Sequence, residues 1–453
     1  MHTGFNPRDI DCFHFMGFSF DEQTMTATLR YGLDDSYLFE ETVRFPAPST
    51  PLSGGQKQAL SKALSLLHLF AGISYYKAAI PPDLSFSALP PDPETAALVE
   101  TLYRHGLGEF AFRNDIRLHD RIHFPDGGPT AEGSIELSQT HGVLVPVGGG
   151  KDSIVSIETL KAAGQPVTLF SVGQAEPIRQ TAERSGLPWL SAQRQLSPTL
   201  FELNRQGALN GHVPVTAIVS VIAICTAIIH RQGAVVLSNE RSANEGNLQL
   251  DDGFVVNHQY SKGLDFEIAL ARHIRHHVVS NIDYFSLLRP WSELAIARQF
   301  SRHQQYHDVF SSCNSNFTIN RTAPSSRWCL NCPKCRFVFL ALAPFLDKRQ
   351  MIDIFGKNLL DDKNQLTGYE ALLGIDAHKP FECVGEEAEC AAAFVLLSQQ
   401  GEWKDDVIVN YFRQRVLPGI DAAEKLPEKY LSATSRHHIP PQYLEIVGAH
   451  FGS

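Results

Sequence analysis

The sequence predicts an α/β protein built on a doubly wound parallel sheet, with a smaller N-terminal α+β domain and a helical C-terminal region. Three observations predict it. Short apolar runs alternate with helical patterns from residue 142 onward, a glycine-rich segment joins the first run to a helix, and the tail beyond residue 345 is mostly helical in pattern. Strands that alternate with helices are typical of a parallel sheet covered on both faces, whose ligands bind at the carboxyl ends of the strands.

The chain of 453 residues is longer than one hydrophobic core usually supports, so we expect several domains. The changes of pattern place them at residues 1–139, 140–345 and 346–453. Hydrophobic residues make up 43% of the chain and charged residues 19%, which is typical of a globular protein.

The formal net charge of −10 gives no sign of the basic stripe that nucleic-acid binding requires, so we expect no nucleic-acid partner. The start of the chain shows no secretory signal, and we expect a cytoplasmic protein. Residues 215–229 are the most apolar stretch, but Thr216, Ser220 and Thr226 interrupt them and they fall short of the roughly 20 residues of a membrane span. We therefore expect a buried helix there and no membrane association; the oligomeric state stays open.

In the N-terminal part, residues 24–31 and 37–45 alternate polar and apolar side chains around Gly32, Asp34 and Asp35, which predicts a hairpin. Residues 60–71 carry apolar side chains at helical spacing. In the α/β part the patterns predict strands at 143–147, 167–172 and 234–238, and helices at 153–163, 175–185 and 215–230. Residues 389–399 are the clearest helix of the tail.

The glycine-rich segment is the first candidate binding site. It consists of Gly148, Gly149, Gly150, Lys151, Asp152 and Ser153. Glycines at a strand-to-helix junction let backbone amides turn inward, and the helix dipole favours an anion there, so we expect the loop to bind the phosphates of ATP. The spacing differs from a Walker A loop, and Asp152 beside a phosphate indicates Mg²⁺. The alternative is a glycine turn in which Asp152 caps the helix.

Four cysteines gather within 23 residues, at Cys313, Cys329, Cys332 and Cys335. Four thiolates are enough for a closed tetrahedral zinc site, and we expect a structural zinc. Three cysteines at three-residue intervals cannot all ligate from one regular helix, so the spacing predicts a knuckle around Pro333 that leads into a helix over 336–342. An iron–sulfur cluster, a redox pair and unligated thiols are the alternatives.

Polar residues follow the strand predicted at 234–238, where a doubly wound sheet binds ligands. The candidates are Asn239, Glu240, Arg241, Asn244 and Asn247. A solvated loop is the alternative.

A second polar group contains His258 and Lys262, which share one face if this segment is helical. The alternative is that both side chains project into solvent from a surface helix and bind nothing. His212 precedes the long apolar helix, where it either contacts a ligand or caps a turn.

The segment 148–153 resembles the loop of the ATP pyrophosphatase superfamily, Ser-Gly-Gly-x-Asp-Ser, whose members adenylate a substrate. Gly148 departs from that pattern and loses one hydroxyl donor. The resemblance implies that Ser171, Val172 and Gly173 lie near the adenosine. A comparable set of cysteines in 7-cyano-7-deazaguanine synthases, which belong to the same superfamily, holds a structural zinc.

Six segments together resemble the MurL family, the UDP-N-acetylmuramoyl-L-alanyl-L-glutamate epimerases of peptidoglycan synthesis. They are Gly-Ile-Ser-Tyr-Tyr-Lys (72–77), Gly-Gly-Gly-Lys-Asp-Ser (148–153), Ser-Asn-Glu-Arg-Ser-Ala-Asn-Glu-Gly-Asn (238–247), Asn-His-Gln-Tyr-Ser-Lys (257–262), Arg-Pro-Trp-Ser-Glu (289–293) and Trp-Cys-x-x-Cys-Pro-Lys-Cys (328–335). The resemblance implies that ATP with Mg²⁺ adenylates the terminal L-glutamate of the UDP-muramoyl dipeptide, which is then inverted to the D form with release of AMP and pyrophosphate.

Within that chemistry, we hypothesise that His258 and Lys262 are the acid and base, and that Glu240 assists the metal or the base. Arg241 and Arg289 are expected to contact phosphate or a substrate carboxylate. Tyr76 and Lys77 are candidates for the nucleotide-sugar pocket, with core packing as the alternative for the tyrosine.

Two other functions fit the same motifs. The first is an amide- or nitrile-forming ligase, in which ammonia attacks the adenylate; the second is a nucleotide-sensing module without catalysis. A tRNA-modifying enzyme is disfavoured by the acidic balance and the lack of an evident RNA-binding appendage.

Overall fold

The computed structural model describes residues 4–118, 121–129, 133–251, 253–316, 327–375 and 380–452. Its centre is a nine-stranded sheet of order β11-β8-β5-β6-β7-β3-β2-β1-β4. The strands are β1 Cys12–Asp21, β2 Thr26–Leu33, β3 Tyr37–Arg44, β4 Asp83–Phe86, β5 Val143–Pro146, β6 Val167–Val172, β7 Trp189–Gln195, β8 Ala234–Leu237 and β11 Asp283–Ser286, with a separate two-stranded ribbon of β9 Leu248–Gln249 and β10 Val255–Val256.

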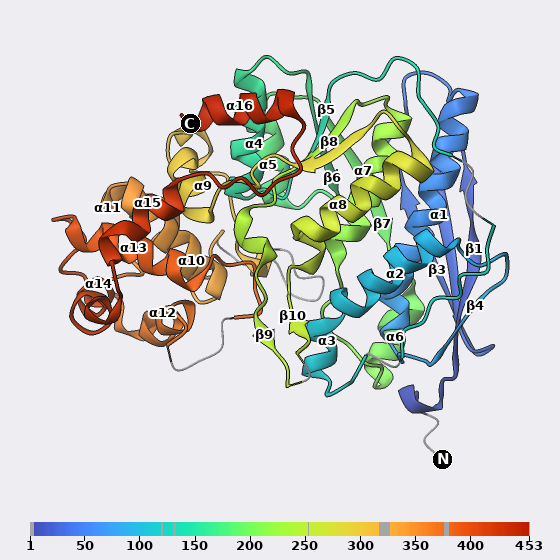
Figure 1. Ribbon diagram of the computed structural model, residues 1–453, viewed down its shortest axis with the longest axis horizontal. Coiled ribbons are helices and arrows are strands. Elements are labelled where there is room, and N and C mark those ends of the chain that lie inside the picture. The colour runs from blue at the N-terminus through green and yellow to red at the C-terminus, as the bar shows by residue number, and fades with distance from the viewer. Residues whose placement is uncertain are drawn as a thin grey trace.

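The helices surround this sheet and form a group of their own beyond it. They are α1 Gly54–Tyr76, α2 Pro93–Gly106, α3 Gly108–Arg113, α4 Lys151–Ala162, α5 Glu176–Ser185, α6 Pro198–Gln206, α7 Val215–Ile229, α8 Leu264–His273, α9 Glu293–Phe300, α10 Pro333–Leu342, α11 Lys348–Phe355, α12 Leu366–Leu372, α13 Glu387–Gln399, α14 Val407–Tyr411, α15 Leu426–Leu431 and α16 Pro441–Phe451. Helices α10 to α15 gather at the end of the molecule opposite the N-terminal strands (Figure 1).

The sheet has a parallel half and a largely antiparallel half. Strands β11, β8, β5, β6 and β7 run parallel to one another, whereas β7–β3, β3–β2 and β2–β1 are antiparallel. The two halves join where Thr42, Val43 and Arg44 pair with Gln195, Arg194 and Gln193. The N-terminal strands therefore extend the parallel sheet.

Residues of the parallel strands are apolar on both faces because both faces are covered. Leu144, Phe170 and Val235 belong to a core shared with α1 and α7. Their strand neighbours Val145 and Leu169 belong to a second core, shared with α4, α9 and α10. Successive side chains of a strand point to opposite faces, so continuous apolar runs supply two cores at once.

Helix α1 begins with a capping box, in which the Ser53 side chain accepts from the amide of Gln56 and the Gln56 side chain accepts from the amide of Ser53. It packs against α7, whose 15 residues are almost entirely buried. In the described part of the chain, no helix combines the length and the apolarity needed to cross a membrane.

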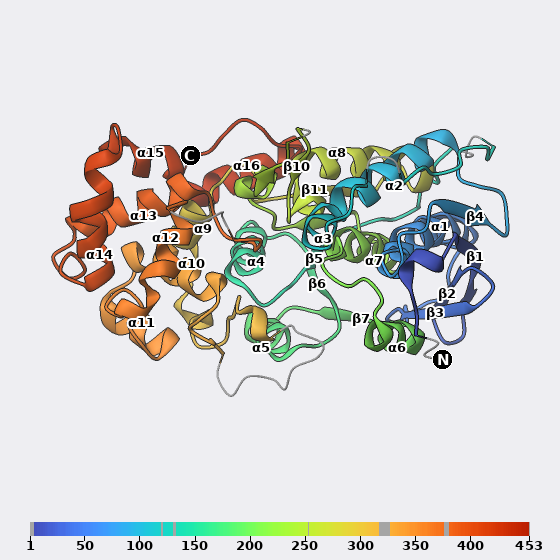
Figure 2. The ribbon, with the colours of Figure 1, turned by 90° about the horizontal axis from the view of Figure 1, so that it is seen from below.

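The C-terminal helices are tied to the sheet through α9. The amide of Leu294 donates to Glu389 Oε1 at 2.7 Å, and Ser292 Oγ donates to the carbonyl of Tyr430 at 2.5 Å. The chain then returns, and α16 packs against α4 (Figure 2). The C-terminal region is thus anchored to the helix layer of the parallel sheet at two places.

These findings confirm the α/β class, the hairpin and the parallel strands predicted from the sequence. The likeness to the ATP pyrophosphatase fold and the three-part division of the chain stay predictions. Strand β1 and the junction of β3 with β7 were not predicted, because pairing between distant strands leaves no local pattern.

Candidate functional site

A cavity of about 380 Å³ opens at the carboxyl ends of the parallel strands. Strand β5 lies between β6 and β8; helix α4, which follows β5, packs in one core, and helix α8, which follows β8, packs in the other. Ligands of open α/β sheets bind at such a switch point. The segments that follow these two strands line the cavity, with Gly148 and Gly150 from the first and Ser238, Asn239 and Glu240 from the second.

The glycine loop turns sharply between β5 and α4. Gly149 has φ +77°, and a Cβ at this position would lie 2.8 Å from the backbone of Pro177. Gly150 is the N-cap of α4, and no described side chain caps this helix. The described residues show no capping bond from Asp152 to this helix terminus, and phosphate binding by the loop stays a prediction. Asp152 and Ser153 line the cavity, beside the helix terminus.

Lys151 is fully buried, and its ammonium is neutralised by two carboxylates. Its Nζ contacts Asp152 Oδ1 at 2.5 Å and forms a second ion pair with Glu293 at the start of α9. This pairing ties α4 to α9. The phosphate contact expected of Lys151 stays a prediction, and Asp152 keeps one of its carboxylate oxygens outside the pair.

Arg289 lies behind the loop that follows β8. It is fully buried and donates to the carbonyls of Glu240 at 2.8 Å and of Lys262 at 2.7 Å, while Glu267 accepts from the same guanidinium at 2.6 Å. Arg289 thus fixes the backbone at two residues that line the cavity. Its predicted contact with phosphate or substrate is not tested by this placement.

The other polar residues of this loop mostly bind the protein itself. Asn239 Nδ2 donates to Ser286 Oγ at 3.0 Å, and Asn244 Oδ1 accepts from the amide of Leu264 at 2.6 Å. Arg241 lies over the ring of Tyr430, 5.0 Å from its centroid, and its Nη2 has no hydrogen-bond partner among the described residues. Among the described residues of this loop, Arg241 therefore has a buried N–H group at Nη2 that is available to a ligand.

Asn247 joins three separate segments. Its Oδ1 accepts from the amide of His258 at 2.9 Å, and its Nδ2 donates to the carbonyl of Pro380 at 3.0 Å. His258 lies in a turn and Lys262 ends a short 3-10 helix, so this stretch is not α-helical and the condition for a shared helix face is not met. Both residues contact Cys383, in the segment just beyond Pro380, and their shared role as acid and base stays a prediction.

Cys383, in that segment, lines the cavity and was not singled out from the sequence. Lys262 Nζ donates to its Sγ at 3.0 Å. Burial alone would raise the pKa of the thiol, but the charges of Lys262 and Lys334 and a hydrogen bond with His258 outweigh it and lower the pKa to about 5. At neutral pH Cys383 is a thiolate.

His258 connects this thiolate to a carboxylate. Its Nδ1 is hydrogen-bonded to Glu109, near the start of α3. Burial alone would lower the pKa of His258, but the hydrogen bonds with Cys383 and Glu109 raise it to about 9. The neighbouring ring of His212 lies 4.2 Å away, and burial lowers its pKa to about 4. His258 is thus charged and His212 neutral.

Sequence reasoning missed Glu109, Lys334 and Cys383. Lys334 could have been predicted from the sequence, because it lies between two cysteines of the motif. Side chains between metal ligands project away from the metal and can reach a neighbouring site. Cys383 and Glu109 stand alone in their segments, and only the fold brings them beside Lys262 and His258.

Five predicted site residues lie elsewhere. Ser171 Oγ donates to the carbonyl of Gly173 at 2.7 Å and accepts from Trp189 Nε1 at 3.0 Å, so the side chain of Ser171 stabilises the carboxyl end of β6. Tyr76 is buried and donates to the carbonyl of Pro81 at 3.2 Å, and Lys77 Nζ donates to Asn210 at 2.9 Å. Tyr76 thus packs in the N-terminal core. The ligand contacts of these residues and of Val172 stay predictions.

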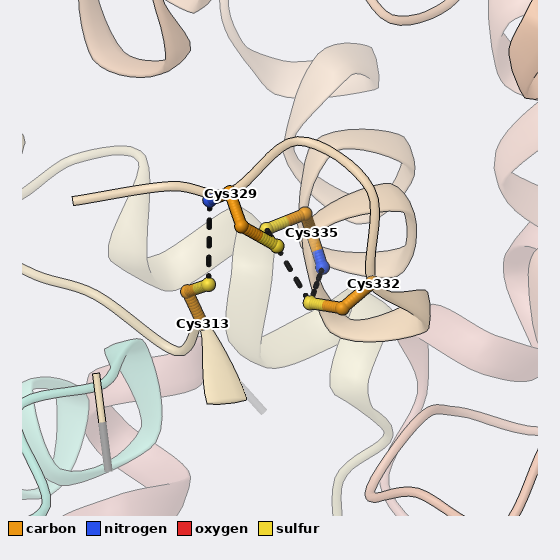
Figure 3. Close-up of side chains that lie close together, drawn as sticks. All are labelled: Cys313, Cys329, Cys332 and Cys335. Carbon is orange, nitrogen blue, oxygen red and sulfur yellow. Dashed lines mark hydrogen bonds between the residues drawn. The ribbon is translucent and has the colours of Figure 1, made fainter. Parts of the chain in front are cut away.

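The four clustered cysteines come together as the spacing predicts (Figure 3). Their sulfurs lie within 4.8 Å of one another, with 3.5 Å between Cys332 and Cys335 and 3.8 Å between Cys329 and Cys335. A tetrahedral zinc ion with Zn–S bonds of about 2.3 Å places its sulfurs about 3.8 Å apart. Cys332 is the N-cap of α10 and Pro333 its first residue, so the turn precedes Pro333 and the helix begins three residues before the expected start at 336. The cluster fits a structural zinc.

The parallel sheet, the cavity beside its glycine loop and the four-cysteine knuckle define an α/β protein with a candidate small-molecule site. Models of the MurL N-terminal and C-terminal domains match residues 4–287 and 309–426. The chain belongs to the MurL family.

Curated relatives match over nearly the whole chain. Proteins of Xanthomonas oryzae pv. oryzae and of a Micromonospora species are 47% and 44% identical, over 99% and 97% of this chain and 99% and 98% of their own. A protein of Salinispora tropica is 46% identical over 89% of this chain and 88% of its own. All three are named UDP-N-acetyl-alpha-D-muramoyl-L-alanyl-L-glutamate epimerase.

Proposed function

We propose that this chain is an ATP-dependent epimerase that inverts the terminal L-glutamate of UDP-N-acetylmuramoyl-L-alanyl-L-glutamate through an acyl-adenylate. The observation that carries the proposal is a single cavity that holds both an anion-binding loop and proton-transfer groups. Gly148, Gly150 and Asp152 line one part of it, and Lys262 and Cys383 line another. Epimerisation by activation requires both kinds of group.

The glycine loop is suited to the triphosphate. The first amides of α4 are not capped by any described side chain, and the helix dipole favours an anion at this end. Asp152 and Glu240 line the cavity and are the carboxylates available to hold Mg²⁺, which would neutralise the phosphates. Lys334, also in the lining, supplies a further positive charge.

Adenylation makes the α-proton removable. A glutamate carboxylate is negatively charged, and this charge opposes formation of a carbanion next to it. The acyl-adenylate is neutral at its carbonyl and can accept the developing charge as an enolate. Inversion then requires a base on one face of the α-carbon and a proton donor on the other. The Cys383 thiol and the ammonium groups of Lys262 and Lys334 line this cavity. His258 is hydrogen-bonded to Cys383.

The cysteine knuckle shapes a wall of the same cavity. Ser311, Ser312 and Asn314 flank Cys313, while Lys334 lies between Cys332 and Cys335, and all four of these flanking residues line the cavity. Zinc held by the four thiolates would fix these side chains in place without taking part in the chemistry.

The proposal is tested by incubating the purified protein with ATP, Mg²⁺ and UDP-N-acetylmuramoyl-L-alanyl-L-glutamate in deuterium oxide. Formation of AMP, D-glutamate in the product and one deuterium at its α-carbon is expected. Incorporation of labelled ammonia without inversion would instead indicate a ligase, and binding of ATP without turnover would indicate a sensor.

A further inference from the structure

The segment that carries Cys383 is anchored residue by residue. Pro380 accepts from Asn247, and the ring of Phe381 packs against Phe112 with Arg113 5.1 Å from its centroid. Glu382 accepts a hydrogen bond from Asn314. Three consecutive residues are thus held by three separate parts of the protein, immediately before the thiol. A group held in this way is positioned for contact with a ligand.

The surroundings of Cys383 differ from those of a structural thiol. Cys225 in α7 is fully buried among apolar residues, and burial raises its pKa. Cys383 lines a cavity and faces the ammonium of Lys262 at 3.0 Å, with Lys334 and His258 close by. Charged partners of this kind stabilise a thiolate, which is a base and a nucleophile.

Glu109 holds the third partner in its charged form. Glu109 is hydrogen-bonded to His258 Nδ1, and His258 is also hydrogen-bonded to Cys383. The carboxylate, the imidazolium and the thiolate form a chain that ends in the cavity. Glu109 is a positioning residue in this chain, since it acts through His258.

We propose that Cys383 is the base that removes the α-proton of the adenylated glutamate, an inference that rests on the proposed epimerase function. The α C–H bond breaks, the proton moves to Sγ to form a thiol, the electron pair of the bond forms the Cα=C bond, and the carbonyl π pair moves to oxygen as an enolate. Water on the opposite face donates a proton to the α-carbon and gives the D form, and the hydroxide it leaves takes the proton of the Cys383 thiol. Water then hydrolyses the adenylate to the D-glutamate carboxylate and AMP. Lys262 and His258 hold the thiolate for the next turnover.

The experiment compares the full-length wild type with Cys383→Ala and with the control Cys12→Ala. Three quantities are measured with ATP, Mg²⁺ and the UDP-muramoyl dipeptide in deuterium oxide: substrate-dependent exchange of pyrophosphate into ATP, deuterium at the glutamate α-carbon, and glutamate chirality. Pyrophosphate exchange reports adenylation alone. Cys383→Ala is expected to keep it within a few-fold and to lose α-deuteration by roughly 10²- to 10⁴-fold, whereas Cys12→Ala keeps both.

Undiminished α-deuteration in Cys383→Ala would overturn the proposal. So would a covalent acyl adduct on Cys383, detected by mass spectrometry of the wild type mixed with both substrates, because it would make the thiolate a nucleophile. If the wild type itself shows no inversion, the proposed function fails, which is a distinguishable result. Should Cys383→Ala fold poorly, alkylation of the wild type by iodoacetamide answers the same question, with loss of inversion expected to parallel modification of Cys383 while pyrophosphate exchange remains.

Discussion

The chain places cysteines in two contrasting surroundings. The four thiols of Cys313, Cys329, Cys332 and Cys335 face one another, whereas Cys383 faces an ammonium and an imidazolium. Four thiolates that surround one point repel one another unless a cation binds between them, so the first arrangement suits a metal ion. The charge of the Cys383 thiolate is already neutralised by Lys262 and His258, so it needs no metal ion and is suited to proton transfer. The partners of a cysteine, more than its burial, decide its chemistry.

The two arrangements also differ in how they are built. The knuckle takes three of its four cysteines from seven consecutive residues. The surroundings of Cys383 come from α3, from the turn at His258, from the 3-10 helix that ends at Lys262 and from the start of α10. The first can be seen in the sequence, and the second exists only in the folded chain.

The largest effect is expected from breaking the knuckle. Cys329→Ser should remove tightly bound zinc and lower the Tm by more than about 5 °C, because metal binding contributes directly to folding free energy. Metal analysis and thermal melts check this. Cys383→Ser is the matched control and should keep both the metal and the Tm; if it loses the metal as well, the contrast between the two sites is wrong.

The glycine loop is expected to be the next most sensitive. Gly149→Ala forces a Cβ to within 3 Å of the Pro177 backbone at a positive φ, so the loop must shift and ATP affinity should fall at least about tenfold. Calorimetry with ATP and Mg²⁺ measures it. Gly164→Ala is the control. Gly164 has φ +68° with no atom near its Cβ position, so alanine there has the same backbone strain but contacts no neighbouring backbone. Equal losses of affinity in the two variants would refute the role of the loop.

Glu109→Gln tests the charge chain through pH. Cys383 is a thiolate above about pH 5 and His258 is protonated below about pH 9, so the wild-type kcat/KM for inversion should be highest between these values. Without the carboxylate, the pKa of His258 falls. The active range should therefore narrow on its alkaline side, by about one pH unit, while the acid side stays where it is. An unchanged profile would show that Glu109 is only structural.

Lys334 links the two cysteine surroundings, because it lies inside the knuckle and lines the cavity. Lys334→Met should raise the KM for ATP or the dipeptide by roughly tenfold while zinc content stays unchanged, since the lost charge belongs to the cavity and the thiols remain. Steady-state kinetics with metal analysis checks this. Loss of zinc with unchanged KM would assign Lys334 to the knuckle alone.

The smallest effect is expected at the anchor of the Cys383 segment. Phe381→Ala removes the packing against Phe112 and the contact with Arg113, so the thiolate should be held less precisely and inversion should slow by about threefold to tenfold. Adenylation, measured by pyrophosphate exchange, should not change. Equal slowing of both steps would mean that the segment shapes the whole cavity.

Much of the site follows from the sequence alone. Apolar runs, a triple glycine and the spacing of Cys329, Cys332 and Cys335 each depend on residues close together in the chain, and the structure contains the strand, the turn and the knuckle that they predict. Local patterns specify local geometry because backbone hydrogen bonding and steric limits act over a few residues.

Only the tertiary structure decided which groups share the cavity. Lys151 forms a buried ion pair with Glu293, and Arg289 donates hydrogen bonds to two backbone carbonyls. Cys383 joins His258 and Lys262 because Asn247 and Asn314 hold its segment against them. A side chain's charge and pKa are set by neighbours in space, which no spacing along the chain records.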